Sequence, residues 1–192
     1  VIHEHSPAVE VDTGSKPFVR TAHGKVNARF VIIACNAYLG RLVPKLYGKV
    51  LPVTSYIIAT EPLGENRARA KIRDGEAVAD TNFIVDYFRM THDTRMLFGG
   101  RASYTTMEPA HLAPDMKKSM VNIFPQLRDT RVDFAWGGYI AITHNRIPDC
   151  GRLSPTAYYA HGYSGQGVAL AGIYGKLMAE AVRGTAERFD LL

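Results

Sequence analysis

The beginning of the chain alternates apolar and polar residues with the two-residue period of β-strands. Val9 and Val11 have polar neighbours, residues 18–21 form a second short stretch of the same kind, and His23 and Gly24 provide a turn. This pattern predicts a small antiparallel meander.

Residues 30–34 are continuously apolar and rich in β-branched side chains. Such runs are typical of strands that are buried on both faces of a parallel sheet. The run ends in the small residues Ala34, Cys35, Asn36 and Ala37, at the carboxyl end of the predicted strand. Because α/β sheets bind ligands at that edge, we expect a ligand near these residues.

Residues 52–136 alternate strand-like segments with long polar connections, which indicates a second unit of the α+β class. Gly137 and Gly138 predict a bulge or bend in the last strand-like stretch. The expected elements are strands at 50–60, 83–90, 96–100, 132–136 and 139–143, and helices at 66–74 and 114–124.

Near the carboxyl end of the chain, an apolar strand leads through a glycine-rich loop directly into a helix. Gly162, Gly165 and Gly167 permit positive φ or close ligand approach, and the first N–H groups of a helix lack backbone acceptors. The junction therefore suits a phosphate or a flavin. Its spacing, G-x-x-G-x-G, differs from the dinucleotide fingerprint G-x-G-x-x-G, so an ordinary α/β connection remains an alternative.

The helix that follows the loop has a buried stripe with three- and four-residue spacing. Gly172 and Gly175 within this helix suggest a face that packs closely against another element. The residues of the stripe are Leu170, Ile173, Tyr174, Leu177, Met178, Ala181 and Val182.

Composition excludes several classes of protein. The chain has 23 Lys and Arg against 18 Asp and Glu, but these basic residues are scattered and do not form a nucleic-acid surface. No apolar stretch reaches the roughly 18 residues of a membrane span, and the start lacks the pattern of a signal peptide, so we expect a cytoplasmic protein without a membrane span. Cys35 and Cys150 are predicted to be reduced thiols in a core, because their spacing fits neither a disulfide framework nor a metal site.

Together, the strand that ends at Ala34, the inserted unit and the glycine loop resemble the carboxyl-terminal half of the D-amino-acid-oxidase-like flavoproteins, the glycine and sarcosine oxidase group. The resemblance implies an α/β fold, namely the carboxyl-terminal part of an FAD-binding Rossmann-like domain interrupted by an antiparallel α+β substrate domain. Residues 1–50 and 141–192 would belong to the FAD-binding domain, and residues 51–140 would form the substrate domain. Because the chain opens on Val1 in a strand-like segment, we expect it to work with a missing amino-terminal part of the same protein.

The resemblance also assigns flavin contacts. The glycine loop looks like the family's late motif beneath the flavin ring, where a helix N-terminus stabilises the anionic reduced flavin. Gly165, Gln166 and Gly167 are therefore the expected catalytic residues. The expected cofactor-binding residues are Val9, Ala34, Cys35, Asn36, Gly162, Tyr163, Ser164, Gly165, Gln166, Gly167 and Val168.

Four residues on expected strands, Tyr87, Arg89, Trp136 and Tyr139, could bind an alkylamine that carries a carboxylate, and His144 could influence proton transfer. Three of them also have a structural interpretation. Trp136 would then be a core residue, Arg89 would form a surface ion pair, and His144 would be a hydrogen-bonded structural histidine.

Several segments are similar to a bacterial branch of this family that oxidises the amine of gamma-glutamylputrescine. That similarity implies hydride transfer to FAD, release of an aldehyde and ammonia, and electron transfer to oxygen. A glycine- or sarcosine-type amino acid oxidase and a remnant domain that no longer binds flavin are the alternatives. The segments are residues 36–40, 60–64, 97–100, 124–127, 162–165 and 186–190.

The chain departs from the family at three positions. Relatives with covalently attached flavin carry a cysteine six residues before a Pro-Asp pair, and here Ile142 stands at that offset from Pro148. We therefore expect non-covalent FAD. Gln166 replaces a frequent histidine and Cys35 a frequent threonine or glycine, so the tuning of the flavin is expected to differ.

Overall fold

The computed structural model describes residues 1–104 and 109–191, without the side chains of residues 101 and 102. The chain forms two compact units. Unit 1 is discontinuous and consists of Val1–Pro52 and Ile140–Leu192, whereas unit 2 is the continuous segment Val53–Tyr139 between them.

Unit 1 begins with a three-stranded antiparallel sheet of β1 (Ala8–Asp12), β2 (Phe18–Thr21) and β3 (Lys25–Asn27). Val11 pairs with Val19 in its register. The predicted meander is confirmed.

The second sheet of unit 1 has the order β10–β11–β4, with β4 at Val31–Ile33, β10 at Asp149–Ser154 and β11 at Ala157–His161. All residues of β11 are buried, and β11 runs parallel to β4 and antiparallel to β10. The parallel pairing predicted for the apolar run is confirmed. Its burial on both faces is wrong, because Ile32 is 46% exposed and only Val31 and Ile33 point into the core.

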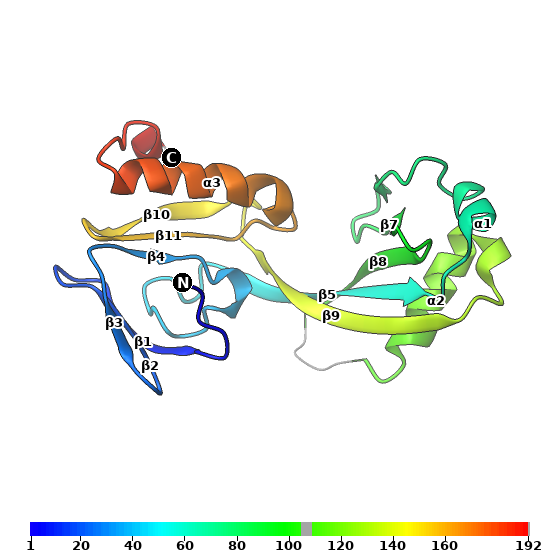
Figure 1. Ribbon diagram of the computed structural model, residues 1–192, viewed down its shortest axis with the longest axis horizontal. Helices are drawn as coiled ribbons and strands as arrows, with labels where there is room; N and C mark the ends of the chain where they lie inside the picture. The colour runs from blue at the N-terminus through cyan, green and yellow to red at the C-terminus, as the bar shows by residue number, and fades with distance from the viewer. Residues whose placement is uncertain (105–108, 192) are drawn as a thin grey trace. The chain divides into compact units, whose positions relative to one another are not determined.

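Helix α3 (Gly167–Val182) lies along β10 and β11, with the 3-10 turn η3 (Phe189–Leu191) after it (Figure 1). Leu177, Met178 and Ala181 of the helix pack against Tyr158 and Ala160 of β11. This apolar contact holds the glycine loop between two packed elements.

The predicted stripe of α3 is only partly buried, because Ile173 is 58% exposed. A methyl group added at Gly172 or Gly175 would meet no atom within 4 Å. The close packing that these glycines suggested is therefore not made by any described residue.

Unit 2 is built on a five-stranded sheet of order β6–β7–β8–β5–β9, in which β5 pairs antiparallel with β8, and β7 with both β6 and β8. Its strands are β5 (Leu51–Thr60), β6 (Val78–Ala79), β7 (Tyr87–Met90), β8 (Met96–Ser103) and β9 (Val132–Ile142). The helical elements are α1 (Glu65–Arg69), α2 (Leu112–Ile123) and η2 (Pro125–Leu127), and η1 (Asn36–Tyr38) belongs to unit 1.

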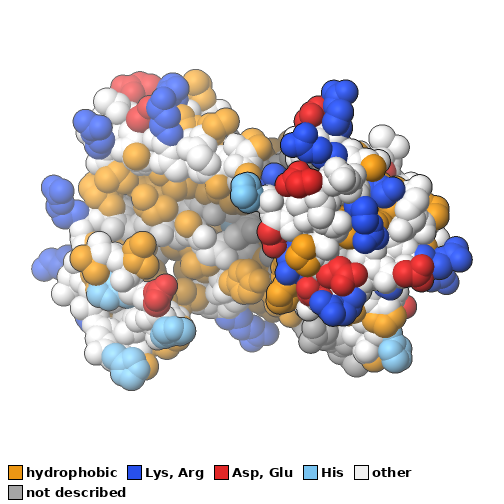
Figure 2. All heavy atoms as spheres, turned by 45° about the vertical axis from the view of Figure 1, so that its right-hand side comes forward, with side chains coloured by type: hydrophobic (Ala, Val, Ile, Leu, Met, Phe, Trp, Pro, Cys, Tyr) orange, Lys and Arg blue, Asp and Glu red, His pale blue; other side chains and the backbone are white. Residues whose placement is uncertain are grey.

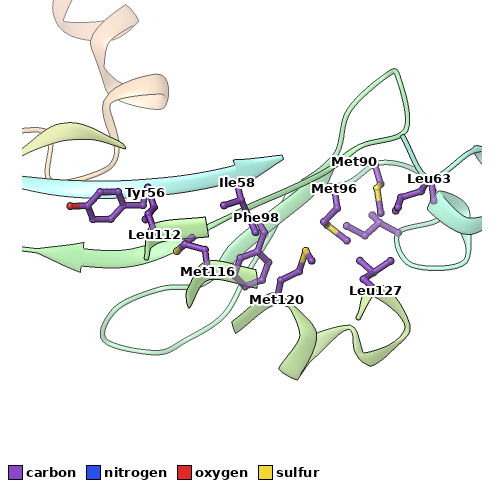
Figure 3. Packing of buried hydrophobic residues seen from close by; sticks show 12 residues of the cluster. Tyr56, Ile58, Leu63, Met90, Met96, Phe98, Leu112, Met116, Met120 and Leu127 are labelled. Atoms are coloured by element: carbon purple, nitrogen blue, oxygen red, sulfur yellow. The ribbon is translucent and has the colours of Figure 1, made fainter. Parts of the chain in front are cut away.

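The core of unit 2 lies between its sheet and α2. Met116 and Met120 of α2 are fully buried against Phe98 of β8 and Ile58 of β5 (Figure 3). Flexible methionine side chains suit this irregular space between a helix and a twisted sheet. The predicted hairpin of β7 and β8 and the predicted helix α2 are confirmed, but β7 begins at Tyr87 and not at residue 83 as expected.

Three structural expectations are wrong. The two strands expected at 132–136 and 139–143 are one continuous strand, β9, which runs through Gly137. A Cβ at this position would lie 2.7 Å from Cδ1 of Tyr56, so glycine lets the ring fit. Helix α1 ends at Arg69, several residues before the predicted end. Cys35 is a free, exposed thiol rather than a core residue, and Cys150 is a half-buried free thiol.

Charged side chains of both signs are interspersed on the face seen in Figure 2. Many of them pair on the surface, as Arg20 does with Glu10 and Arg69 with Glu65. Within the described chain, none of the helices has the length and apolar character needed to cross a membrane.

Candidate active site

The candidate site is the junction between β11 and α3. Gly162, Ser164 and Gly165 adopt positive φ angles of 72°, 51° and 97°. A Cβ at Gly162 would lie 2.3 Å from Cγ2 of Thr143, so this position requires glycine for space as well as for conformation. A Cβ at Gly165 would meet nothing within 4 Å, and the loop is open there.

Asn36 connects the two segments that the sequence singled out. The Gly162 N–H donates to Oδ1 of Asn36 at 3.0 Å, across 126 positions of sequence. Asn36 itself has a φ of 48°, which asparagine tolerates better than most residues. On the other side, the Ser164 N–H donates to the carbonyl of Ala141 at 2.9 Å. Residues of unit 1 therefore fix the loop from both sides.

The N–H groups of Gly165, Gly167, Val168 and Ala169 have no acceptor among the described residues. They belong to the last part of the loop and the first turn of α3, where the helix dipole is positive. The Gln166 N–H differs, because it donates to the carbonyl of Tyr163 at 2.8 Å. Four N–H donors are thus free for an electronegative group, and the backbone of Gln166 is not among them.

Val9 and His144 are exposed. Val9 lies on β1, at a register shift between Ala8 and Glu10. His144 lies in the turn after β9, and its ring has no hydrogen bond among the described residues. The interpretation of His144 as a hydrogen-bonded structural histidine is therefore wrong for the described chain.

Tyr87 and Arg89 of β7 line one cavity of about 170 Å³ in unit 2. The Tyr87 hydroxyl lies 3.1 Å from Oγ of Ser55. Arg89 is exposed, and no carboxylate of the described chain lies within ion-pair distance of it. The surface ion pair considered for Arg89 is therefore not formed by the described residues.

Trp136 is 44% exposed, so its interpretation as a core residue is wrong. It precedes Gly137, whose Cα faces Tyr56 in the core of unit 2. Because successive side chains of a strand point to opposite faces, Trp136 lies on the sheet face away from α2. Tyr139, at the end of unit 2, is half-buried.

Sequence reasoning missed a polar cluster of Lys49, Asp149, Tyr159 and His161. Nε2 of His161 lies 2.7 Å from Oδ2 of Asp149, and the Tyr159 hydroxyl donates to Oδ1 at 3.1 Å. The Lys49 ammonium donates to the Tyr159 hydroxyl at 2.9 Å and lies 3.1 Å from Oδ2 of Asp149. Tyr159 and His161 are two residues apart on β11, and this spacing was the available signal that they share a face.

Burial acts to raise the pKa of Asp149, but the hydrogen bonds from His161 and Lys49 outweigh it and hold that pKa below its usual value. His161 is 2% exposed, and its Nδ1 has no partner among the described atoms. For Cys150, burial and the neighbouring Asp149 charge raise the pKa, so the group stays a thiol at neutral pH.

Comparison with known proteins adds to this geometry. The sequence pattern of the FAD dependent oxidoreductase family matches residues 1–181. The chain is 42% identical over 195 residues to "Probable oxidoreductase OrdL" of Haemophilus influenzae, with 99% of this chain and 44% of the relative covered. It is 39% identical over 190 residues to gamma-glutamylputrescine oxidoreductase of Escherichia coli, with 98% and 45% covered.

Among solved structures, glycine oxidase from Geobacillus kaustophilus is similar with a TM-score of 0.79 and 19% sequence identity. The match covers 94% of this chain and 49% of that one, and at this identity it supports the fold alone. The α/β fold of FAD-dependent oxidoreductases, with an inserted antiparallel unit, is thereby confirmed. The chain spans about half the length of the curated relatives that it matches.

Proposed function

Because this chain belongs to the FAD-dependent oxidoreductase family, we propose that it supplies the flavin-ring end of a site that oxidises a small amine to an aldehyde, with release of ammonia. The observation that carries the proposal is the glycine loop, held by Asn36, with free N–H donors at its open end. Unit 1 would hold the cofactor, and unit 2 would bind the substrate.

Two features of the loop support the proposed contact with an isoalloxazine ring. The N–H groups of Gly165, Gly167 and Val168 are unused within the described chain, and no side chain fills the space beside Gly165. Electronegative atoms are stabilised by such donors at a helix N-terminus. We propose that these three residues hold the electronegative edge of the flavin, with Ala34, Cys35 and Asn36 beside them and Val9 near the adenine.

FAD, when bound, supplies the acceptor for the hydride that leaves the carbon next to the amine nitrogen. Water then adds to the imine that remains and releases the aldehyde and ammonia. The donors of the loop are already fixed by Asn36 and Ala141, so they need little reorganisation when negative charge develops. Gly165 and Gly167 are therefore the proposed catalytic donors. The exposed side-chain amide of Gln166 is a proposed contact, because its own N–H is used within the loop.

We propose non-covalent attachment of the flavin. Cys150 is half-buried, and the raised pKa of its thiol keeps it a poor nucleophile. Ile142 is not a nucleophile. Denaturation in acid should release all of the yellow colour into the supernatant, and colour retained in the protein pellet would contradict this assignment.

The proposed substrate is gamma-glutamylputrescine, because a relative that is 39% identical carries this substrate in its name. The test is anaerobic bleaching of the flavin absorbance in the purified protein that carries these 192 residues. Bleaching by gamma-glutamylputrescine but not by glycine supports the assignment. Bleaching by glycine or sarcosine instead would make the protein an amino acid oxidase.

A purified protein without flavin absorbance, and without FAD binding on addition of the cofactor, would refute the enzymatic proposal altogether. Val168→Pro offers a specific control, because proline removes one proposed N–H donor and is tolerated in the first turn of a helix. We expect weaker FAD binding with an unchanged melting temperature of the FAD-free protein.

A further inference from the structure

The polar cluster of Lys49, Asp149, Tyr159 and His161 consists of titratable side chains that the proposed mechanism does not use. Nε2 of His161 lies 2.7 Å from Oδ2 of Asp149. The Tyr159 hydroxyl donates to Oδ1 of the same carboxylate at 3.1 Å, and the Lys49 ammonium does so at 3.3 Å. One carboxylate of unit 1 therefore accepts hydrogen bonds from three side chains of the same unit.

The polar cluster joins chain segments that meet at the start of the glycine loop. A Cβ at Gly162 would lie 3.2 Å from Cγ1 of Val50 and 3.7 Å from the backbone nitrogen of Asp149. Val50 follows Lys49 directly in the chain, and Gly162 follows His161 directly. The hydrogen bonds of the cluster therefore link the same backbone segments that surround Gly162.

Asp149 fixes the orientation of the His161 ring. The lowered pKa of Asp149 keeps its carboxyl ionised at neutral pH, so Nε2 of His161 carries the proton of their hydrogen bond. The His161 ring also meets the Tyr159 ring edge to face, with the two centroids 5.4 Å apart, and His161 is 2% exposed. A charge-assisted hydrogen bond and a ring contact thus hold this side chain directly before Gly162.

Stability alone does not account for a polar cluster at this place. Replacing a buried ion pair by well-packed apolar side chains is often neutral or stabilising, because the burial of charges has a cost in desolvation. Buried polar groups instead select one arrangement, since other arrangements leave some of them unpaired. The arrangement selected here is the path of β11 into the glycine loop, where Gly162, Ser164 and Gly165 have positive φ angles.

The donors of the glycine loop depend on the direction of the backbone at its start. The Gly162 N–H donates to Oδ1 of Asn36 at 3.0 Å. The free N–H groups of Gly165 and Gly167 follow along the same loop. A shift of the backbone at His161 would move the Gly162 N–H away from its acceptor and change the direction of the donors that follow. Misplacement by about 1 Å is enough to weaken the function of such groups strongly.

We propose that His161 is a positioning residue, which holds the glycine loop in the geometry that binds FAD through its hydrogen bond to Asp149. Lys49 and Tyr159 hold Asp149 in place. The inference rests on the proposed function for the contact between the loop and the flavin. It adds a role for the polar cluster, which acts on the flavin through the loop.

The test compares two variants at His161 in the protein that carries these residues. His161→Gln keeps an N–H donor at about the reach of Nε2, whereas His161→Phe keeps a ring without a donor. We expect His161→Phe to raise the Kd for FAD about tenfold and His161→Gln to stay within about twofold of the wild type. In the FAD-free protein, hydrogen exchange of the Gly162 amide should become faster in His161→Phe and stay unchanged in His161→Gln.

The midpoint potential of the bound flavin separates positioning from a purely structural role. Misdirected N–H donors stabilise the negative charge of the reduced flavin less well, so affinity for the reduced form should fall more than affinity for the oxidised form. A tenfold difference between these losses lowers the midpoint potential of a two-electron couple by about 30 mV, which we expect for His161→Phe. A loss of stability alone would lower the melting temperature and leave the potential unchanged.

Tyr159→Phe is a second variant, which tests the cluster even if His161→Phe does not fold. It removes a hydroxyl that donates to Asp149 and keeps the ring beside His161. We expect FAD binding to weaken about threefold. Tyr158→Phe is the matched control on the same strand, because the Tyr158 hydroxyl makes no hydrogen bond among the described residues.

The outcomes separate this inference from the proposed function. A wild-type protein that binds no FAD, with Gly162 exchange that still depends on the His161 donor, would refute the proposed function and keep the positioning of the loop. FAD binding that is equal in the wild type, His161→Phe and Tyr159→Phe would overturn the positioning role and keep the function. Equal losses in His161→Gln and His161→Phe would also overturn it, because the donor to Asp149 would then have no effect.

Discussion

At the scale of single residues, Asp149 is the carboxylate at the centre of the polar cluster with Lys49, Tyr159 and His161. Its carboxylate accepts hydrogen bonds from His161, Tyr159 and Lys49. Asp149→Asn replaces one of the two acceptor oxygens by an NH₂ group, so two of these donors would lose a good acceptor. It also removes the negative charge opposite Lys49. We expect a loss of about 2 kcal/mol in the free energy of unfolding at pH 7, measured by urea denaturation.

The same substitution predicts a pH dependence. The pKa of Asp149 is lowered in the folded state, so its ionised form contributes stability above the unfolded pKa of about 4. This contribution is lost as the pH falls through the folded-state pKa. The difference in stability between the wild type and Asp149→Asn should therefore shrink between pH 5 and pH 3.

Asp129→Asn is the matched control, because Asp129 is exposed and makes no hydrogen bond or ion pair among the described residues. It should leave the free energy of unfolding at pH 7 unchanged. A constant difference between Asp149→Asn and the wild type over the whole range would show that the charge of Asp149 does not stabilise the fold.

Gly162 and Gly165 provide a second comparison of residues. Both have positive φ, but only Gly162 lacks room for a Cβ, because Thr143 lies beside it. Gly162→Ala should cost more than 2 kcal/mol of stability, and Gly165→Ala about 1 kcal/mol, which reflects backbone strain alone. Thermal denaturation checks this order, and equal losses would show that the contact with Thr143 relaxes freely.

At the scale of elements, β9 depends on a close contact between neighbouring strands. A Cβ at Gly137 would lie 2.7 Å from the ring of Tyr56 on β5. Gly137→Ala should destabilise the protein by about 1–3 kcal/mol, since overpacking displaces the ring. In a Tyr56→Leu background the added methyl should cost much less, and an equal cost in both backgrounds would contradict the ring contact.

Elements with a clear hydrophobic period were predictable from the sequence. The expectations that proved wrong depend on tertiary contacts, which the local pattern does not contain. The meander and the parallel strand of residues 30–34 followed from local patterns, as did α2 with its proline boundary. The continuous path of β9 did not, because two glycines look like a bend until the ring of Tyr56 is seen beside one of them. The exposure of Ile32 and Ile173 depends on which element packs against them, and the periodicity of the sequence does not predict that packing.

The candidate site was likewise predictable from the sequence only in part. The glycine loop was visible in the sequence, and the resemblance to a family tied it to Asn36. The hydrogen bond of the Gln166 N–H within the loop was not predictable, because it depends on the three-dimensional path of the loop. The contacts of the Tyr87 ring with Ser55 and Gly99 were not predicted, because a serine and a glycine in strands carry no signal of a neighbouring ring in the sequence.

At the scale of the molecule, unit 1 carries exposed apolar side chains on two elements. Ile32 lies on β4, the end strand of its described sheet, and Val168 and Ile173 lie on α3. Exposed apolar surface near an open strand edge favours association. Residues 1–192 produced alone should therefore self-associate at micromolar concentration in sedimentation velocity experiments.

Ile173→Lys should reduce this association, because it places a charge on the exposed part of α3 without touching the contacts of Leu177 and Met178. Lys176→Arg, also exposed on α3, is the control that keeps the charge. A monomeric wild-type chain would show that the exposed side chains of Ile32, Val168 and Ile173 do not drive self-association.

The bond between Asn36 and Gly162 also has a consequence for synthesis. The ribosome releases β4 before unit 2, but the parallel partner of that strand and the loop that Asn36 holds emerge only after all of unit 2. Unit 2 is one continuous segment and its core can close as soon as η2 and β9 have left the exit tunnel. The nascent chain would thus contain a folded unit 2 before the two segments of unit 1 can pair. A folded unit 2 shortens the distance between these segments, and the entropic cost of bringing them together is then smaller.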